Sequence, residues 1–151
     1  MLTEGSAAPD FQSGGWSLSN ALKNGPVLLV FFRISCPTCQ LTFPFLRRLA
    51  DNARPGAPEL IAISQDDGKG TAQFQQRFGP SAPALLDAGP VYPVSNAYQI
   101  RHVPALYLIE ADGRISMAVS GFSKAHLEEL GERFGAVTFH DGERVPAMRP
   151  G

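Results

Sequence analysis

Residues 27–41 read Val27-Leu28-Leu29-Val30-Phe31-Phe32-Arg33-Ile34-Ser35-Cys36-Pro37-Thr38-Cys39-Gln40-Leu41 and contain both cysteines of the chain. The apolar run at the start of this stretch is typical of a strand that is covered on both faces, and it predicts a strand over 27–33. After the cysteines, apolar residues return at helical spacing, at Leu41, Phe45, Leu46 and Leu49. The stretch therefore predicts a strand, a tight turn and a helix that runs to about residue 52. Pro44 lies within this helix and is expected to kink it.

The two cysteines lie at the start of the predicted helix, a position that favours ionisation of a thiol. Unpaired backbone N–H groups give a helix N-terminus a partial positive charge, and that field favours the thiolate form of Cys36. Pro37 suits the first helical position, where a missing N–H costs nothing. Cys39 lies one turn further on, within disulfide reach. We predict a dithiol switch in which Cys36 attacks and Cys39 resolves, with Thr38 as the intervening residue that tunes the redox poise.

Three other interpretations of the cysteine pair are weaker. Buried cysteines can act as small apolar residues, but a Cys-Pro-x-Cys sequence at a strand–helix junction is an unusual place for them. A structural zinc site needs four ligands, and the sequence offers no second cysteine pair and no histidine pair at ligand spacing. A purely structural disulfide would close too short a loop to remove much entropy from the unfolded chain. We therefore expect no metal and no cofactor.

Composition narrows the choice of partners. The 151 residues fit one domain, and the net charge of −1 with no basic patch argues against nucleic acid. No apolar stretch approaches the roughly 18–20 residues needed to cross a bilayer. Residues 1–9 have neither a basic region nor an apolar core, so they do not resemble a signal peptide. If Met1 is the native start, we expect a cytoplasmic protein, and a cysteine pair there is more often catalytic than structural. The oligomeric state is left open.

The remaining elements complete an alternating order. Strands are expected at 16–18, 59–64, 83–87, 105–109 and 114–119. Helices are expected through residue 22 from a cap at Ser19, at 94–98, through residue 78 from a cap at Asp67 or Thr71, and after a cap at Ser123. Residues 136–151 have no clear period and are expected either to add a strand or to pack as an ordered extension. This order predicts an α/β fold with a central mixed sheet and helices on both faces.

Four segments, taken in order, resemble the thioredoxin superfamily, in particular its TlpA-like or redoxin branch, which is related to AhpC/TSA proteins. They are Gly5-Ser6-Ala7-Ala8-Pro9-Asp10-Phe11, the Cys36–Cys39 motif with Pro44, residues 60–66 and residues 98–115. The likeness spans residues 5–121. It implies that residues 1–151 form a single thioredoxin-like domain with an N-terminal extension, while residues 136–151 form a C-terminal extension outside the match.

The resemblance also implies a second active-site element. In the family, the residue that corresponds to Pro104 is a cis-proline that faces the cysteines, and the residue before it, here Val103, offers backbone hydrogen bonds to a bound polypeptide. The implied partners are disulfide-containing proteins and a thiol reductant or reductase. The chain departs from the family's pattern at three places: Val30 and Thr42 stand where many members have an acid, and Ser35 replaces a tryptophan.

Two further side chains are candidates for tuning the site. His102 precedes Pro104 by two residues, and a cationic histidine there would stabilise a thiolate, although a solvated loop histidine is the more common situation. Arg33 precedes Cys36 by three residues and is either a positive neighbour of the sulfur or a charge in water at the end of the strand.

Two enzymatic functions fit these residues. The first is a thiol–disulfide oxidoreductase that we expect to reduce protein disulfides through Cys36 and Cys39. The alternative is a peroxiredoxin-like thiol peroxidase with antioxidant activity, in which peroxide oxidises Cys36 and Cys39 resolves the sulfenic acid. Peroxiredoxins have the motif Thr-x-x-Cys at the reactive cysteine, whereas this chain has Arg33 at the threonine position. A binding module without redox activity is disfavoured by the intact cysteine pair.

Overall fold

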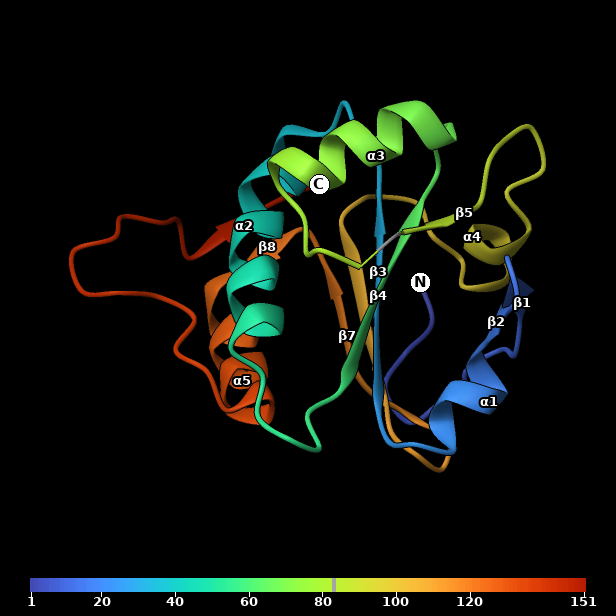
Figure 1. The fold of residues 1–151 in the computed structure, drawn as a ribbon, viewed down its shortest axis with the longest axis horizontal. Coiled ribbons are helices and arrows are strands. Elements are labelled where there is room, and N and C mark those ends of the chain that lie inside the picture. Colours follow the sequence, from blue (N-terminus) through green and yellow to red (C-terminus); the bar gives the residue numbers. More distant parts are fainter. Residues whose placement is uncertain (83) are drawn as a thin grey trace.

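A five-stranded sheet with the strand order β5-β4-β3-β6-β7 forms the centre of the molecule. The computed structural model describes residues 1–82 and 84–151. Strand β3 lies in the middle, parallel to β4 and antiparallel to β6, so the mixed sheet predicted from the sequence is confirmed (Figure 1). The strands of this sheet are β3 (Val27–Phe32), β4 (Glu59–Ser64), β5 (Leu85–Leu86), β6 (Ala105–Ile109) and β7 (Ile115–Ser120).

Helices cover both faces of the sheet because the side chains of β3 alternate between two apolar clusters. Leu28, Val30 and Phe32 point into the cluster under α2, α3 and α5, whereas Leu29 and Phe31 point into the cluster under α1 and α4. Figure 1 shows the two groups of helices on opposite sides of the strands. The helices are α1 (Leu18–Leu22), α2 (Pro37–Asp51), α3 (Gly68–Arg77), α4 (Pro93–Ala97) and α5 (Lys124–Phe134).

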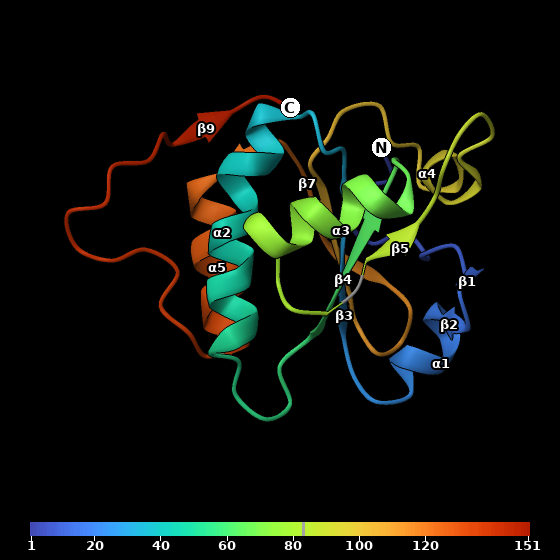
Figure 2. The ribbon, with the colours of Figure 1, turned by 45° about the horizontal axis from the view of Figure 1, so that its top comes forward.

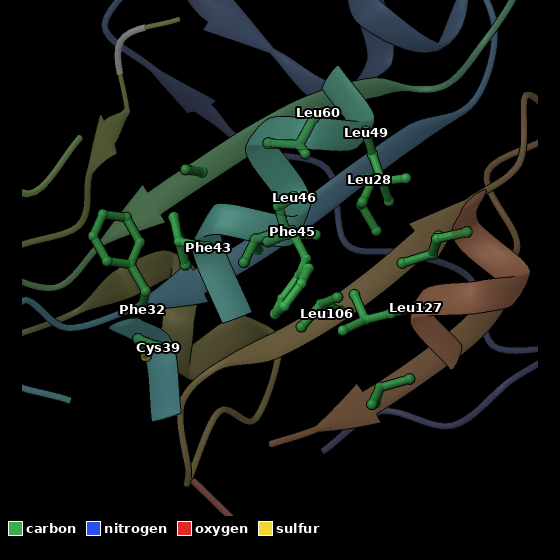
Figure 3. Packing of buried hydrophobic residues seen from close by; sticks show 14 of the residues in the cluster. Leu28, Phe32, Cys39, Phe43, Phe45, Leu46, Leu49, Leu60, Leu106 and Leu127 are labelled. Carbon is green, nitrogen blue, oxygen red and sulfur yellow. The ribbon is translucent and has the colours of Figure 1, made fainter. Parts of the chain in front are cut away.

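The larger cluster contains the cysteine-bearing helix. In Figure 3, Cys39, Phe43 and Leu46 project from α2 towards the sheet. Phe43 packs against Phe32 of β3 at 4.6 Å between ring centroids and against Phe74 of α3 at 5.0 Å. Pro44, by contrast, is exposed, so the helix tolerates it on its solvent side. The core therefore holds α2, and with it the cysteine motif, at a fixed position over β3.

Several element boundaries differ from those expected. Helix α1 begins at Leu18 because the Ser17 side chain caps it, which corrects the expected cap at Ser19. The expected strand at 16–18 is shortened to β2 (Trp16–Ser17), paired with β1 (Gln12–Ser13). Strand β3 ends at Phe32, so Arg33 belongs to the exposed turn. The expected strand over 83–87 is reduced to β5, and residue 83 lies outside the described residues.

The C-terminal extension both adds a strand and packs on the core. Strand β9 (Met148–Arg149) pairs antiparallel with β8 (Phe122–Ser123), which directly precedes α5. Phe139 and Val145 pack against the larger cluster. Arg48 of α2 holds the loop between them, donating hydrogen bonds to the backbone oxygen of Thr138 and to the Glu143 carboxylate. Figure 2 shows that the chain then returns to the first turn of α2.

Candidate functional site

Cys36 occupies the N-cap position of α2, at the carboxyl end of the central strand. Its sulfur accepts a hydrogen bond of 3.0 Å from the backbone N–H of Cys39, and its backbone oxygen accepts one of 3.1 Å from Gln40. Pro37 follows as the first helical residue, as predicted. The Cys36 side chain is only half-buried, so a reactant from solvent can reach its sulfur. The predicted placement of this cysteine at the helix start is confirmed.

Cys39 faces the core and is fully buried. Burial raises the pKa of its thiol far above the ordinary value, because a thiolate would lose its hydration there. The hydrogen bond with Cys36 raises this pKa further. Both cysteines are free thiols in the structure. The Cys36 sulfur is therefore in the more accessible position, which suits attack on a substrate, and the buried Cys39 sulfur is in the position that suits resolution.

The loop that carries Val103 and Pro104 lies directly beside Cys36. The Val103–Pro104 peptide bond is cis, as the resemblance implied. The Cys36 thiol donates a hydrogen bond of 3.3 Å to the backbone oxygen of Val103. The backbone of Val103 is thus within bonding distance of the attacking sulfur, and a chain bound to that backbone would lie over Cys36.

A hollow of about 290 Å³ opens beside Cys36 and brings both tuning candidates into the site. Arg33 and His102 both line it, together with Gln65 and Gly151. Arg33 is not simply a solvated charge, since its Nε donates a hydrogen bond of 2.5 Å to Oε1 of Gln65. Gln65 is buried and donates in turn to the Ser95 hydroxyl at 2.9 Å. The Arg33 side chain is therefore held next to the cysteine by a hydrogen-bond chain.

Thr38, between the two cysteines, is buried and contacts the far end of the chain. Its hydroxyl donates a hydrogen bond of 2.8 Å to the backbone oxygen of Pro150. The sequence singled out Thr38 but gave no sign of this partner. The contact brings the C-terminal extension to the first turn of α2.

Asp66 is a site residue that sequence reasoning missed. Its carboxylate accepts a hydrogen bond of 2.8 Å from the backbone N–H of Ile34, in the turn before Cys36, and its negative charge adds to the raised pKa of Cys39. Strands β3 and β4 are parallel with Phe32 opposite Ser64, so the residues after both strands meet at one edge. That pairing was the available signal for placing Asp66 near the cysteines.

No cluster of three histidine, cysteine or acidic side chains in the described ranges 1–82 and 84–151 is arranged to hold a metal ion. In the same part of the chain, no helix is both long and apolar enough to cross a bilayer. The positions where acids are common in the resembled family, Val30 and Thr42, are both buried, and the Thr42 hydroxyl donates to the backbone oxygen of Thr38.

Comparison with known proteins agrees with this site. A model of the AhpC/TSA family matches residues 5–118, which include the cysteine motif and the Val103–Pro104 loop. The chain belongs to the AhpC/TSA family. The redoxin resemblance inferred from the four sequence segments is thereby confirmed.

Relatives of this AhpC/TSA protein carry consistent names. Thiol-disulfide oxidoreductase ResA of Bacillus subtilis (strain 168) is 26% identical over 125 residues, covering 80% of this chain and 69% of that protein. ResA of Geobacillus kaustophilus (strain HTA426) is 28% identical over 137 residues, covering 83% of this chain and 77% of that protein. With the Cys36–Cys39 dithiol, these matches place the chain among thiol–disulfide oxidoreductases.

A solved structure supports the fold. The crystal structure of a putative thiol:disulfide interchange protein DsbE from Chlorobium tepidum aligns with a TM-score of 0.71 at 22% identity, covering 88% of this chain and 96% of that one. The thioredoxin-like fold class predicted from the sequence is therefore confirmed.

Proposed function

We propose that this protein reduces disulfide bonds in polypeptide substrates through Cys36 and Cys39. The observation that carries the proposal is the position of the Cys36 sulfur, which is accessible from solvent, caps α2 and lies 3.3 Å from the Val103 backbone oxygen. A disulfide in a polypeptide that runs along Val103 would meet this sulfur directly. The general class of partner, a disulfide-containing protein, fits the activity of the family members described above.

The reaction is a pair of thiol–disulfide exchanges. The Cys36 thiolate attacks one sulfur of the substrate disulfide, forming a mixed disulfide and releasing the other substrate sulfur, which takes up a proton. Cys39 then loses its proton and attacks the Cys36 sulfur, releasing the second substrate thiol and closing the Cys36–Cys39 disulfide. The substrate disulfide gains two electrons and two protons, and the protein dithiol loses them. A second thiol reductant or reductase must then restore the dithiol.

The raised pKa of Cys39 matters for the second step, since a buried neutral thiol is a poor nucleophile. Asp66 follows β4, and its carboxylate accepts a hydrogen bond from the turn that leads to Cys36; we propose that it assists proton removal from Cys39. Asp66 would then take the role of the acids that many family members have at the positions of Val30 and Thr42.

The direction of electron flow and the compartment are further proposals. We propose a cytoplasmic protein working as a net reductant. Equilibration with glutathione buffers, followed by thiol trapping and mass spectrometry, measures the potential of the Cys36–Cys39 couple. A value of roughly −220 to −270 mV supports a cytosolic reductant, whereas a value near about −120 mV makes the protein an oxidant and contradicts the proposal.

Two cysteine variants test the mechanism. Cys36→Ser is expected to abolish insulin reduction, because no attacking sulfur remains. Cys39→Ser is expected to accumulate a mixed disulfide between Cys36 and insulin, visible by mass spectrometry and released by dithiothreitol. Full insulin reduction by Cys36→Ser, or a trapped adduct on Cys39 in the wild-type protein, would show that the roles are assigned wrongly. A binding module without redox activity would instead show no insulin reduction even as the wild-type protein, and Cys36→Ser would leave its function unchanged.

A thiol peroxidase is the second candidate, favoured by the AhpC/TSA family match. In that reaction, hydrogen peroxide would oxidise Cys36 to a sulfenic acid and leave as water, and Cys39 would close the disulfide with loss of a second water. Peroxide consumption by the reduced protein at a rate exceeding its insulin reduction would make this the principal activity. We expect the opposite order, since Arg33 takes the place of the threonine found in peroxiredoxins.

A further inference from the structure

The last residues of the chain lie across the same backbone that the proposed substrate would use. The 147–151 segment (Ala147–Gly151) runs antiparallel to β8, with Arg149 opposite Phe122, and the backbone N–H of Lys124 donates a hydrogen bond of 3.0 Å to the Ala147 oxygen. Beyond this short ladder, the Pro150 oxygen receives the hydrogen bond from Thr38. The segment therefore bridges from the edge of β8 to the residue between the two cysteines.

Two glycines permit this close approach. Gly151 lies against Val103, where a Cβ on the glycine would come within 2.1 Å of the Val103 oxygen. Gly121 has a φ of +79°, and a Cβ there would come within 2.5 Å of the Arg149 oxygen. Its backbone N–H donates to the Pro104 oxygen at 2.8 Å, which ties the contact to the cis-proline loop. A side chain at either position would separate the segment from the loop.

The 147–151 segment has the features of a bound extended peptide. It makes backbone hydrogen bonds to a strand edge, it reaches Val103, and it lines the hollow beside Cys36 through Gly151. Addition of an extended peptide to an exposed strand edge is a general mode of polypeptide recognition that uses main-chain bonds. The exposed Met148 side chain shows that the segment is held mostly by its backbone and not by burial of its side chains.

We propose that the edge formed by Gly121, Val103 and Thr38 is a docking edge for extended polypeptide, and that the 147–151 segment occupies it until a disulfide-bearing substrate chain displaces it. This inference rests on the proposed function, because it takes polypeptide disulfides as the substrates. The segment acts as an intramolecular competitor. It weakens binding of polypeptides by the fraction of time that it covers the edge, and it leaves small disulfides largely unaffected because Cys36 is half-exposed beneath it.

The test compares two disulfides of different size with the reduced protein. One is insulin, and the other is 5,5′-dithiobis(2-nitrobenzoate), which needs no strand edge. In a variant that ends after Pro146, we expect the insulin rate to rise about 10-fold if the edge is open about one tenth of the time, with the small-disulfide rate changed less than about 2-fold. An unchanged or lower insulin rate, or an equal rise for both reactants, would overturn the proposal.

A full-length variant tests the same proposal if the truncated protein fails to fold. Gly151→Val places a side chain where the Val103 oxygen lies, and we expect it to raise the insulin rate in the same selective way. Val137→Ser changes an exposed residue of the same extension and serves as the matched control, with both rates unchanged. If Gly151→Val matches the wild type in its insulin rate, the segment is not a competitor.

A structural readout separates failure of this proposal from failure of the proposed function. In the mixed disulfide between Cys39→Ser and an insulin chain, the backbone amide of Arg149, which pairs with Phe122 in the β8–β9 ladder, should exchange with solvent at least 10-fold faster than in the free protein. Slow exchange in a fully formed adduct would show that the substrate binds elsewhere and would overturn the docking edge. If no adduct forms and neither disulfide is reduced, the proposed function itself is wrong.

Discussion

The backbone N–H of Cys39 donates a hydrogen bond to the Cys36 sulfur at 3.0 Å, so the sulfur expected to attack also caps the helix that carries its partner. The same sulfur contacts the Val103 oxygen at 3.3 Å. One atom thus joins the start of α2 to the cis-proline loop. Cys39, one turn later, has no exposed surface. This difference in environment leads to the first prediction.

The stability of the reduced protein should fall as the pH rises above about 8.5, the ordinary pKa of a cysteine thiol. Burial keeps Cys39 protonated in the folded state, whereas the thiol ionises in the unfolded chain, so the folded state binds more protons. The free energy of unfolding should therefore decrease by up to about 1.4 kcal/mol per pH unit. Urea unfolding in reductant between pH 7.5 and 9.5 measures this slope.

Cys39→Ala is the control for this slope, since it removes the thiol and leaves a small side chain. The variant should lose most of the alkaline decrease. Buried Tyr98 and Tyr107, whose pKa values are also raised, add their own decrease only near and above pH 10. An identical slope in wild type and variant below pH 9.5 would show that Cys39 is not the group responsible.

Phe43→Ala should destabilise the protein by about 3–5 kcal/mol, the usual cost of removing a fully buried phenylalanine. The ring packs against Phe32 and Phe74 and has no exposed surface, so its removal leaves a cavity between α2 and the sheet. Chemical denaturation measures the loss. Phe78→Ala is the matched control, because Phe78 contacts the same Phe74 ring but is only partly buried, and its loss should be clearly smaller.

The sequence predicted the cysteine motif and its supporting elements because their signals are local. The apolar run of β3, the helical spacing after Cys39 and the proline at the first helical position each involve neighbouring residues. The error at α1 is also local: Ser17 and Ser19 both suit a cap, but the Ser19 backbone N–H is bonded to the Asp10 carboxylate, and the helix starts one residue after Ser17.

What the sequence did not predict involves distant residues and backbone atoms. Thr38 and Pro150 are 112 positions apart, and the acceptor is a main-chain oxygen that has no signature in the sequence. The contact between Gly151 and Val103 is likewise between backbones. The family pattern places acids at the positions of Val30 and Thr42 and not at that of Asp66. The parallel pairing of β3 and β4 brings the Asp66 carboxylate to the turn before Cys36.

The pKa of the Glu143 carboxyl is expected to be about 2, chiefly because it accepts hydrogen bonds from the Arg48 guanidinium and also from the His140 backbone. This lowered pKa means that the interaction is fully present above about pH 4.3 and is lost as the pH falls through about 2. Arg48→Gln should raise the pKa towards the ordinary value of 4.5, while the hydrogen bond from the His140 backbone still lowers it in part. Two-dimensional NMR of the side-chain carboxyl follows the titration directly.

Arg133→Gln provides the matched control for Arg48→Gln. Arg133 pairs with Glu110 on another part of the surface, and its removal should raise the pKa of Glu110 while leaving that of Glu143 unchanged. If Arg48→Gln leaves the Glu143 titration where it was, the loop between Thr138 and Glu143 is not anchored to α2 in solution.

Thr38→Val should release the end of the C-terminal extension, because valine keeps the shape of threonine but cannot donate to the Pro150 oxygen. One hydrogen bond of this kind contributes about 1 kcal/mol, so the amide of Arg149, which pairs with Phe122 of β8, should exchange with solvent about 5-fold faster. Thr42→Val is the matched control: it removes a buried hydroxyl from the same helix, but that hydroxyl donates to the Thr38 oxygen and not to the extension. Faster exchange in Thr38→Val alone identifies the Thr38–Pro150 bond as the link between the cysteine motif and the extension. Equal exchange in both variants would mean that β8 holds the strand by itself, and that the residue between the cysteines has no part in keeping it there.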